Sequence, residues 1–309
     1  MKTLRKVLVV GSYVVDLMSR TPHMPSPGET VLGGPFQMGP GGKGGNQAVA
    51  AARLGYQVTM LTKVGHDTFG DEAFANFKNE KIDASYVSRH PEEATGTALI
   101  AVDQQSENMI IVAPGACGKI TKEDVLQARK AFEEADIILT QLETSQEAVE
   151  TTIELAHELG KPLVLNPAPF QPVSTDLLKK VTYITPNETE ARLLTGIHVV
   201  DEDTARQAAK VLIEMGVDHV VITLGKAGCF LFDGTDEGVL IPSIKVDVAD
   251  TTGAGDAFNG ALASFVADGY RLKEAAIRAN AAAALAVTKW GTAPAMPYHH
   301  ELKAFLGER

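Results

Sequence analysis

The alternation of short apolar runs with longer amphipathic or alanine-rich segments constrains the fold of this chain more than any other feature of its sequence. Apolar runs that predict strands occur at residues 7–10, 58–61, 136–140, 163–166, 183–185 and 219–224. Segments that predict helices occur at 46–54, 71–81, 121–135, 145–159, from 187 onward, and at 204–215, 253–267 and 273–289, the last two after a β-rich stretch at 229–246. Strands that alternate with helices pair in parallel, and the helices cover both faces of the sheet. We therefore predict an α/β fold with a doubly wound, mostly parallel sheet.

Two β-rich segments interrupt this alternation. Residues 12–36 hold short β-like pieces broken by Pro22, Pro25 and Pro27, and two more β-rich runs lie within 95–113 with no helix between them. Proline at this density is typical of edge strands and turns. We expect the two segments, with bounds of about 12–38 and 95–113, to form one small sheet beside a single domain that spans 1–309.

Charge and composition exclude several classes of partner. The chain has 28 Lys and Arg against 39 Asp and Glu, a net charge of −11, which argues against a nucleic acid or an anionic membrane as partner. No apolar run reaches the ~18 residues of a membrane span, and the first residues lack the pattern of a signal peptide, so we expect a cytoplasmic protein. Cys117 and Cys229 form no CxxC pattern, so neither a disulfide framework nor a structural zinc site is expected.

Glycines gather in three places, and the first is residues 39–45, directly before an alanine-rich helix. Three of these glycines match the spacing of the dinucleotide-binding fingerprint. That fingerprint, however, directly follows the first strand and is completed by an acidic residue about 20 positions on, and neither condition is met here. The segment is either a flexible turn or, with Lys43 and Asn46 projecting from it, a close approach to an oxygen-rich ligand such as a sugar. We favour the second interpretation.

The second glycine site is the run Asp-Thr-Thr-Gly-Ala-Gly-Asp at 250–256, which leads into an apolar helix. Small residues at a helix start expose N–H groups that can stabilise an anionic transition state. Asp256 falls in the first helical turn, where an acid is also common simply because it stabilises the helix dipole. A set of anion-binding donors with a carboxylate beside it is what phosphoryl transfer requires, because the carboxylate takes the proton of the attacking hydroxyl. The third site, residues 223–228, by itself predicts a hairpin turn.

At these residues the sequence resembles the ribokinase branch of the PfkB carbohydrate-kinase family. The match covers essentially the whole chain and rests on two distant motifs in the right order, Gly-Gly-Lys-Gly-Gly-Asn at 41–46 and the run at 250–256. The resemblance implies a ribokinase-like doubly wound α/β domain with a small β-sheet lid that often forms the contact of a homodimer. It also implies ATP-dependent phosphorylation of the 5-hydroxyl of D-ribose or 2-deoxy-D-ribose, with Mg²⁺ and with K⁺ or a similar monovalent cation as activator.

The same resemblance assigns roles to individual residues. Asp256 looks like the catalytic base, and its anion hole would be Gly253, Ala254 and Gly255. The sugar-binding positions are Val14, Asp16, Gly41, Gly42, Lys43, Asn46, Glu143 and Asp256, of which Glu143 follows an apolar strand. The nucleotide and magnesium side would be Asn187, Glu190, Thr223, Gly225, Gly228, Gly255 and Asn280, with Asn187 also expected to cap a helix. The monovalent-cation site would be Asp250, Thr252, Ala286, Lys289, Gly291 and Ala295, where ribokinases commonly have serine in place of Ala295.

Val14 bears on which sugar is used. Ribokinases usually read Gly-Ser-x-Asn-x-Asp in the first sugar-binding segment, and here the asparagine is replaced by Val14. An amide can hydrogen-bond a sugar hydroxyl and a valine cannot, so a fully hydroxylated sugar should bind less well. Related 2-deoxyribose kinases carry a hydrophobic residue at this position. Either 2-deoxy-D-ribose is a good substrate, or Val14 packs within the lid and D-ribose is the main substrate.

Two wider alternatives stay open. The chain could be another kinase of the family, for nucleosides or phosphorylated sugars, or a sugar sensor without catalysis on the same fold. The intact Asp256 and the Gly-Ala-Gly run at 253–255 argue against the sensor. Outside these motifs, Trp290 follows an apolar helix and is expected to pack in the interior.

Overall fold

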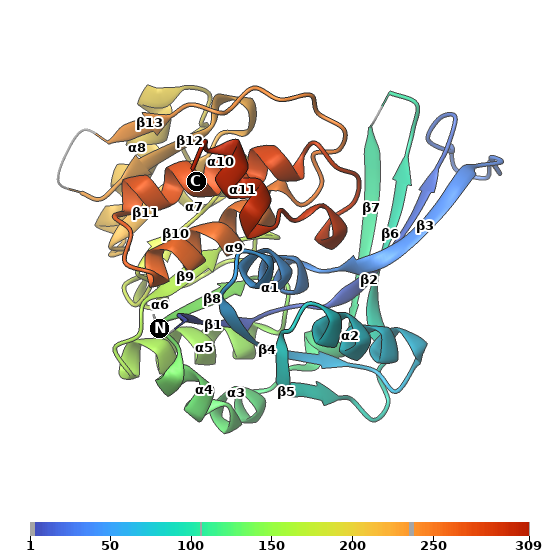
Figure 1. Cartoon of the computed structure of the whole chain (residues 1–309), viewed down its shortest axis with the longest axis horizontal. Coiled ribbons are helices and arrows are strands. Elements are labelled where there is room, and N and C mark those ends of the chain that lie inside the picture. The colour runs from blue at the N-terminus through green and yellow to red at the C-terminus, as the bar shows by residue number, and fades with distance from the viewer. Residues whose placement is uncertain (1–3, 106, 235–237, 309) are drawn as a thin grey trace.

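A large central sheet runs through the molecule (Figure 1). The structure is a computed structural model that describes residues 4–105, 107–234 and 238–308, and within them this sheet has nine strands in the order β13-β12-β11-β10-β9-β8-β1-β4-β5. These strands are β1 (Lys6–Val10), β4 (Gln57–Val64), β5 (Asp83–Arg89), β8 (Ile137–Gln141), β9 (Leu163–Asn166), β10 (Tyr183–Ile184), β11 (His219–Thr223), β12 (Cys229–Phe232) and β13 (Val239–Ile241). Neighbours from β5 to β11 pair in parallel, whereas β12 and β13 are antiparallel.

Helices cover both faces of this sheet. They are α1 (Lys43–Arg53), α2 (Thr68–Asn79), α3 (Lys122–Gln127), α4 (Arg129–Glu134), α5 (Gln146–Glu158), α6 (Thr175–Leu178), α7 (Glu188–Thr195), α8 (Glu202–Glu214), α9 (Ala254–Ala267), α10 (Leu272–Ala286) and α11 (His299–Phe305). Successive residues of a strand point to opposite faces. Val7 and Val9 accordingly join a buried cluster with residues of α1, α2 and α9, while Leu8 and Val10 join one with α3, α4 and α5. The predicted doubly wound, mostly parallel α/β fold is confirmed.

A second, smaller sheet projects from one side of the molecule, on the right in Figure 1. Its order is β3-β2-β6-β7, with β2 (Val14–Arg20), β3 (Gly34–Gly41), β6 (Thr95–Val102) and β7 (Asn108–Gly115). The central pair, β2 and β6, is parallel and the two outer pairs are antiparallel. The predicted small sheet is therefore present. Its strands β3 and β7 extend past the predicted bounds of 38 and 113, to Gly41 and Gly115, and a helical segment follows each of them. Its action as a lid stays a prediction.

Three segments differ from the sequence predictions. The helix expected at 121–135 is two helices, α3 and α4, because Ala128 between them has a ψ of 7°. Strand β5 was not predicted, since it is an edge strand whose half-exposed sequence contains no apolar run. In the β-rich stretch at 229–246, of which residues 229–234 and 238–246 are described, the described strands are the short β12 and β13 and the other described residues are irregular.

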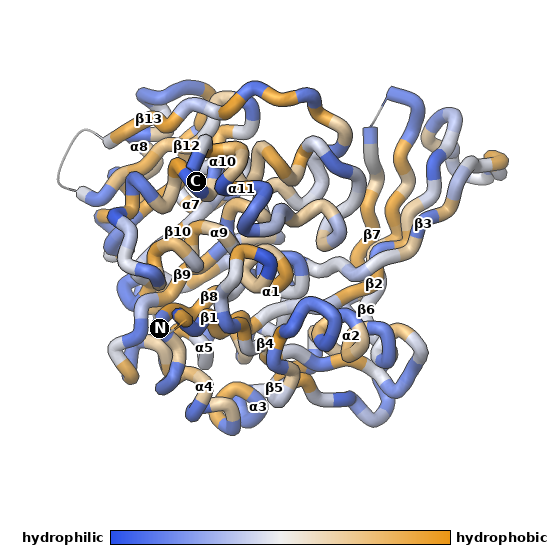
Figure 2. The backbone as a smooth tube through the Cα atoms, in the orientation of Figure 1, coloured by the Kyte–Doolittle hydropathy of each residue, from blue (hydrophilic) through white to orange (hydrophobic). Residues whose placement is uncertain are grey.

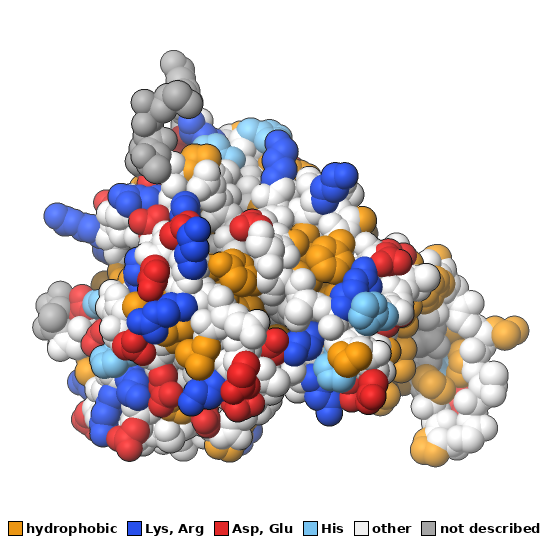
Figure 3. Space-filling view, turned by 90° about the horizontal axis from the view of Figure 1, so that it is seen from below, with side chains coloured by type: hydrophobic (Ala, Val, Ile, Leu, Met, Phe, Trp, Pro, Cys, Tyr) orange, Lys and Arg blue, Asp and Glu red, His pale blue; other side chains and the backbone are white. Residues whose placement is uncertain are grey.

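Large apolar side chains are exposed on and beside the small sheet. They are Leu32, Phe36, Leu99, Met109 and Ile111. Hydrophobic segments run through the strands of both sheets (Figure 2), and the space-filling view shows such side chains on the projecting part (Figure 3). A contiguous apolar patch marks an interaction surface more often than scattered residues do. Among the helices that the structure describes, none is long and apolar enough to cross a bilayer.

Helices α1 and α9 approach each other closely at Gly260. A Cβ atom on Gly260 would lie 2.5 Å from the carbonyl oxygen of Gln47 and 2.7 Å from the Cβ of Ala50. Only a glycine at this position lets α9 lie so close to α1, so the relative placement of the two helices depends on it.

Gly260→Ala should therefore destabilise the protein although alanine favours helices. The added methyl group forces the helices apart, and overpacking of this kind costs about 1–3 kcal/mol, more than the roughly 1 kcal/mol gained in helix propensity. Urea unfolding followed by circular dichroism measures the change in the free energy of unfolding. Gly34→Ala is the matched control, because a Cβ there would meet nothing within 4 Å. A Gly260→Ala variant as stable as the parent protein would contradict this account of the contact.

Candidate active site

Polar residues gather at the carboxyl ends of the parallel strands, where open α/β sheets bind ligands. Gln141 ends β8 and Asn166 ends β9. Helices α1 and α9 begin at the same edge, since side chains from their first turns are hydrogen-bonded together. Their N-cap residues are Gly42 and Gly253, neither of which makes a side-chain capping bond. At α1 the N–H groups of Lys43 and Gly45 already donate to Glu143 and to the Ser12 carbonyl. At α9 the N–H groups of Gly255 and Asp256 have no partner among the described residues, so the start of this helix is open to a ligand.

A cleft of about 290 Å³ lies at this edge. Most residues predicted for the anion hole and the nucleotide side line it, namely Asn187, Glu190, Thr223, Gly225, Gly228, Gly253, Ala254, Gly255, Asp256 and Asn280. Lys43 also lines it, and Lys43 and Asp256 are the two residues that it shares with the predicted sugar-binding set. The other predicted sugar-binding residues are not among those that line this cleft.

Asp256 lies in the first turn of α9 and is buried. Its Oδ2 accepts a hydrogen bond from Asn46 Nδ2 at 2.9 Å, and its Oδ1 accepts one from Gln47 Nε2 at 3.0 Å. Burial raises the pKa of Asp256 above its ordinary value and Glu143 adds to the rise, while Lys43 and the two amides oppose it. A carboxylate that is fixed in orientation and has a raised pKa is suited to accept a proton from a substrate hydroxyl.

Gln47 belongs to a buried chain of amides that the sequence analysis missed. Besides Asp256, its Nε2 donates to Asn166 Oδ1 at 3.1 Å, and its Oε1 accepts from Gln141 Nε2 at 2.7 Å. The side chains of Gln141 and Asn166 thus fix the amide that fixes Asp256. Both residues end apolar strands, so the rule that drew attention to Glu143, that ligands bind where strands end, was the signal that could have found them.

Glu143 closes the start of α1. Its Oε2 accepts hydrogen bonds from the backbone N–H of Lys43 at 2.9 Å and from the Ser12 hydroxyl. Asn46 Oδ1, by contrast, is buried and has no hydrogen-bond partner among the described residues. A buried carbonyl oxygen of this kind requires a donor, and a ligand hydroxyl between α1 and α9 would supply it.

Asp16 lies on β2 opposite Gly39 of β3. Its Oδ2 accepts a hydrogen bond from Thr292 Oγ1 at 2.7 Å. Burial raises the pKa of Asp16 to about 6; the Thr292 hydrogen bond opposes this rise, and the charges of Asp256 and Glu143 add to it. Burial alone would lower the pKa of the Lys43 ammonium, but the carboxylates of Asp256, Glu143 and Glu190 hold it above its ordinary value. The site therefore gathers several acids around one lysine.

Asn187 and Glu190 form the N-cap of α7. Asn187 Oδ1 accepts from the Glu190 N–H at 2.8 Å, and Glu190 Oε2 accepts from the Asn187 N–H at 2.9 Å. The predicted capping by Asn187 is confirmed. Burial raises the pKa of Glu190, and both residues also line the cleft.

The glycine site at 223–228 connects β11 and β12, which form the antiparallel hairpin that the segment predicted. Gly225 and Gly228 have φ values of 48° and 104°, a region that favours glycine. Asn280 lines the same cleft and donates from Nδ2 to the Pro242 carbonyl at 2.7 Å.

The residues predicted to hold a monovalent cation lie in two adjacent segments. Asp250 Oδ1 accepts from the N–H and hydroxyl of Thr252, and Asp250 Oδ2 accepts from the Gly291 N–H at 3.1 Å. The N–H of Asp250 in turn donates to the Val287 carbonyl at 3.2 Å. Ala295 is buried in the next turn of chain, and its methyl group offers no oxygen. Of the described residues, no three or more His, Cys, Asp or Glu side chains form a metal-binding group.

Val14 is buried at the base of the small sheet. It pairs with Gly96 of β6, and a Cβ on Gly96 would lie 2.8 Å from Val14 Cγ1. The valine therefore packs in the interior, as one of the two interpretations expected. The other interpretation is not affected, because a packed valine still lacks the hydrogen-bonding amide of asparagine.

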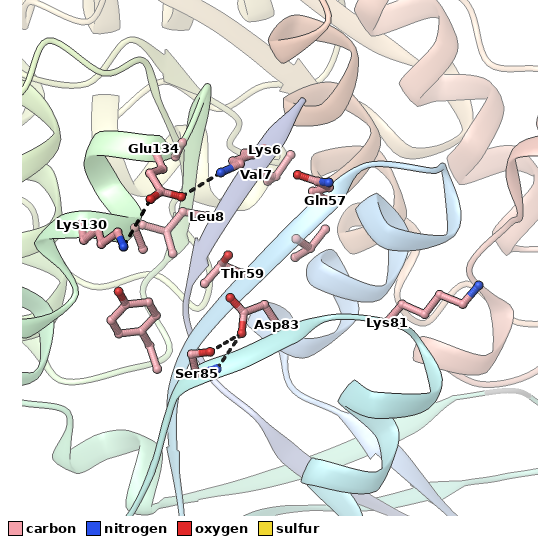
Figure 4. Close-up of a pocket in the computed structure, with 14 residues that line it drawn as sticks. Lys6, Val7, Leu8, Gln57, Thr59, Lys81, Asp83, Ser85, Lys130 and Glu134 are labelled. Carbon is pink, nitrogen blue, oxygen red and sulfur yellow. Dashed lines mark hydrogen bonds and ion pairs between the residues drawn. The ribbon is translucent and has the colours of Figure 1, made fainter. Parts of the chain in front are cut away.

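A larger hollow of about 470 Å³ lies at the amino ends of β1, β4 and β5, away from the predicted residues (Figure 4). Lys6 and Lys130 are already paired there, since the Nζ of Lys6 lies 2.7 Å and that of Lys130 3.8 Å from Glu134. Asp83 likewise accepts from the backbone and hydroxyl of Ser85. Nothing in this hollow calls for a ligand, so size alone does not make it a functional site.

The fold and the open start of α9 around Asp256 define an α/β enzyme of the phosphoryl-transfer class. The model of the pfkB family carbohydrate kinases matches residues 4–298. The ribokinase of Haemophilus influenzae is 40% identical over 98% of this chain and 99% of its own length, and the deoxyribokinase of Salmonella typhi is 37% identical over 97% and 98%. The structure of Arabidopsis thaliana ribokinase complexed with ribose and ATP matches with a TM-score of 0.90 at 29% identity, covering 99% of this chain and 100% of that one.

The chain belongs to the pfkB family of carbohydrate kinases. It is a phosphotransferase that uses an alcohol group as acceptor.

The raised pKa of Asp16 has a consequence for stability. Its ordinary value is 3.8 and its folded value about 6, so between these values the folded state binds a proton that the unfolded state releases. Stability contributed by Asp16 is therefore lost as the pH rises through this range. Asp16→Asn should raise the free energy of unfolding by about 1–3 kcal/mol at pH 7.5, with little gain near pH 4.

Urea unfolding of variant and parent protein at both pH values measures this difference. The control is Asp176→Asn, because Lys179 lowers the pKa of that exposed carboxyl and its loss should not stabilise the protein. An Asp16→Asn variant that is no more stable than the parent protein at pH 7.5 would contradict the expected sign.

Proposed function

We propose that this protein is a pentose kinase that transfers the γ-phosphoryl group of ATP to the 5-hydroxyl of D-ribose, 2-deoxy-D-ribose or both. The observation that carries the proposal is the buried Asp256, held by two amides at the start of a glycine-capped helix. The relatives support it, since they include ribokinases and a deoxyribokinase, and one solved structure contains ribose and ATP.

The sugar would bind between the small sheet and the starts of α1 and α9. Asp16 and Glu143 offer carboxylate oxygens for sugar hydroxyls, and the unpartnered Oδ1 of Asn46 would accept another. Gly41 and Gly42 bring the backbone close, because a Cβ at Gly41 would lie 2.2 Å from the Asp16 carboxylate. Small-sheet closure over the sugar would exclude water and limit hydrolysis of ATP.

Asp256 would accept the proton of the 5-hydroxyl as this oxygen attacks the γ-phosphorus. The N–H groups at the start of α9, from Gly253 to Asp256, would stabilise the charge that develops on the transferring group. Lys43 adds a positive charge on the same side of the cleft. The two amide hydrogen bonds hold the carboxylate of Asp256 in place while its proton moves.

ATP would occupy the cleft lined by Thr223, Gly225, Gly228 and Asn280. Mg²⁺ usually binds through one or two carboxylates and the substrate phosphates, and Glu190 is the buried carboxylate on this side. When bound, Mg²⁺ would neutralise phosphate charge. The adjacent segments at 250–252 and 286–291 offer carbonyl, carboxylate and hydroxyl oxygens for a monovalent activator, with one hydroxyl fewer because of Ala295. The homodimer through the small sheet and the cytoplasmic location stay predictions.

Asp256→Asn should abolish most of the turnover and keep sugar binding. Removing a general base lowers kcat by about 100- to 10,000-fold, whereas the amide can still bond to one of its two neighbours. ADP release measures kcat, and calorimetry with D-ribose measures binding. Asp176→Asn, on an exposed surface, is the matched control. Near-normal turnover of Asp256→Asn would refute the role of Asp256 as base.

The choice between the two pentoses rests on Val14. Comparing kcat/KM for D-ribose and 2-deoxy-D-ribose decides it, and a preference for ribose above about a hundredfold, close to 3 kcal/mol, would exclude deoxyribose as a main substrate. A sugar panel that includes nucleosides and sugar phosphates separates the other kinases of the family, and absence of ADP release with all of them would favour the sensor.

Val14→Asn should shift the preference toward ribose by about 1–3 kcal/mol, which is the cost of one unpaired polar group. The measured quantity is the ratio of kcat/KM values for the two sugars in variant and parent protein. Because Val14 is packed against Gly96, Val14→Thr serves as a second variant that adds a hydroxyl without lengthening the side chain. An unchanged ratio in both variants would show that this position does not select the sugar.

A further inference from the structure

The segment from Trp290 to Thr292 touches both halves of the proposed site. Trp290, which the sequence analysis wrongly expected in the interior, is 53% exposed, and the guanidinium of Arg20 on β2 lies 4.4 Å from its ring centroid. The N–H of Gly291 donates to Asp250, at the start of the run that leads into α9. One short segment therefore links the small sheet to the helix that carries the proposed catalytic base.

Within this segment the hydroxyl of Thr292 is directed at the sugar side. Thr292 is buried, and its Oγ1 lies 2.7 Å from Asp16 Oδ2 and 3.2 Å from the Pro40 carbonyl oxygen. A hydroxyl donates one hydrogen bond at a time, and the shorter contact is to a charged acceptor, which makes the stronger bond. The proton of Thr292 therefore points at Asp16.

The Asp16 carboxylate is held between two fixed groups. On one side a Cβ on Gly41 would lie within 2.5 Å of both carboxylate oxygens, so Asp16 packs against the backbone there. On the other side is Thr292, which among the described residues supplies the hydrogen bond to this carboxylate. The negative charges of Asp256 and Glu143 repel the Asp16 carboxylate, so neither residue holds it in a fixed orientation.

Thr292 itself has a firm support. The guanidinium of Arg53, at the end of α1, donates to the carbonyl oxygens of Pro294 at 3.0 Å and Met296 at 2.9 Å. A Cβ on Gly253 would lie 3.3 Å from the Thr292 Cα, so the backbone before α9 packs against it. A residue held in this way can impose an orientation on a partner.

We propose that Thr292 is a positioning residue of the sugar site, whose hydroxyl holds the Asp16 carboxylate in the orientation that accepts the hydroxyl groups of the pentose. This inference rests on the proposed function. It assigns to the C-terminal segment a part in sugar recognition that the motifs at 41–46 and 250–256 do not contain.

The test compares Thr292→Val, which removes the hydroxyl and keeps the shape, with Thr292→Ser, which keeps the hydroxyl. Thr292→Val should raise the Kd and KM for the better pentose by about tenfold, the effect of one charged hydrogen bond, and leave kcat and the KM for ATP within about twofold of the parent protein. Thr292→Ser should restore both sugar constants to within about threefold. Thr152→Val is the matched control, because that buried hydroxyl on α5 lies outside the proposed site and donates to the Ala148 carbonyl.

Asp16→Asn provides a second, independent readout. If Thr292 acts through Asp16, adding Thr292→Val to Asp16→Asn should change the sugar constants much less than it does in the parent protein. Unchanged sugar constants in Thr292→Val, equal losses in the valine and serine variants, or additive effects in the double variant would each overturn the proposal. If Thr292→Val does not fold, Thr292→Ala takes its place in the same comparison.

Calorimetry with D-ribose and 2-deoxy-D-ribose alone separates this inference from the proposed function. A parent protein that binds a pentose but releases no ADP overturns the kinase proposal, while the Thr292 comparison can still be made on Kd. A parent protein that binds neither pentose overturns both. Normal kinase activity with unchanged sugar constants in Thr292→Val overturns the inference alone.

Discussion

The close contact between α1 and α9 governs the rest of the site. Because Gly260 lets the two helices approach, Asn46 and Gln47 on α1 reach the carboxylate of Asp256 on α9. The two helices come from segments about 200 residues apart in the chain, and each begins with a glycine-rich turn at the same edge of the sheet. One packing contact therefore fixes both the proposed base and the open start of α9.

The acidic composition of the chain raises the question of how its site would bind an anionic ligand. The chain carries a net charge of −11, and Asp16, Glu143, Glu190 and Asp256 lie near one another around Lys43. The one lysine does not neutralise four acids, and burial raises the pKa of Asp16, Glu190 and Asp256. An anionic ligand at this edge depends on backbone N–H groups at the helix starts and on bound cations more than on basic side chains.

Features that depend on neighbouring residues could be predicted from the sequence. The alternation of apolar runs with helical segments predicted a sheet covered by helices on both faces. The small residues at 250–256 predicted an open helix start with Asp256 in its first turn. The capping of α7 by Asn187 followed in the same way.

Features that depend on contacts between residues far apart in the chain could not be predicted from the sequence. The bond between Thr292 and Asp16 joins residues 276 positions apart, and nothing near Thr292 in the sequence marks it. Gln47 directly follows the motif at 41–46, but its contacts with Gln141 and Asn166 depend on which strands become neighbours. Trp290 illustrates the same limit, since an apolar helix before it suggested burial, while the position of Arg20 on the small sheet decides its surroundings. Trp290 is also the single tryptophan of the chain, so intrinsic fluorescence gives an unlabelled optical signal from the junction between the small sheet and the main body.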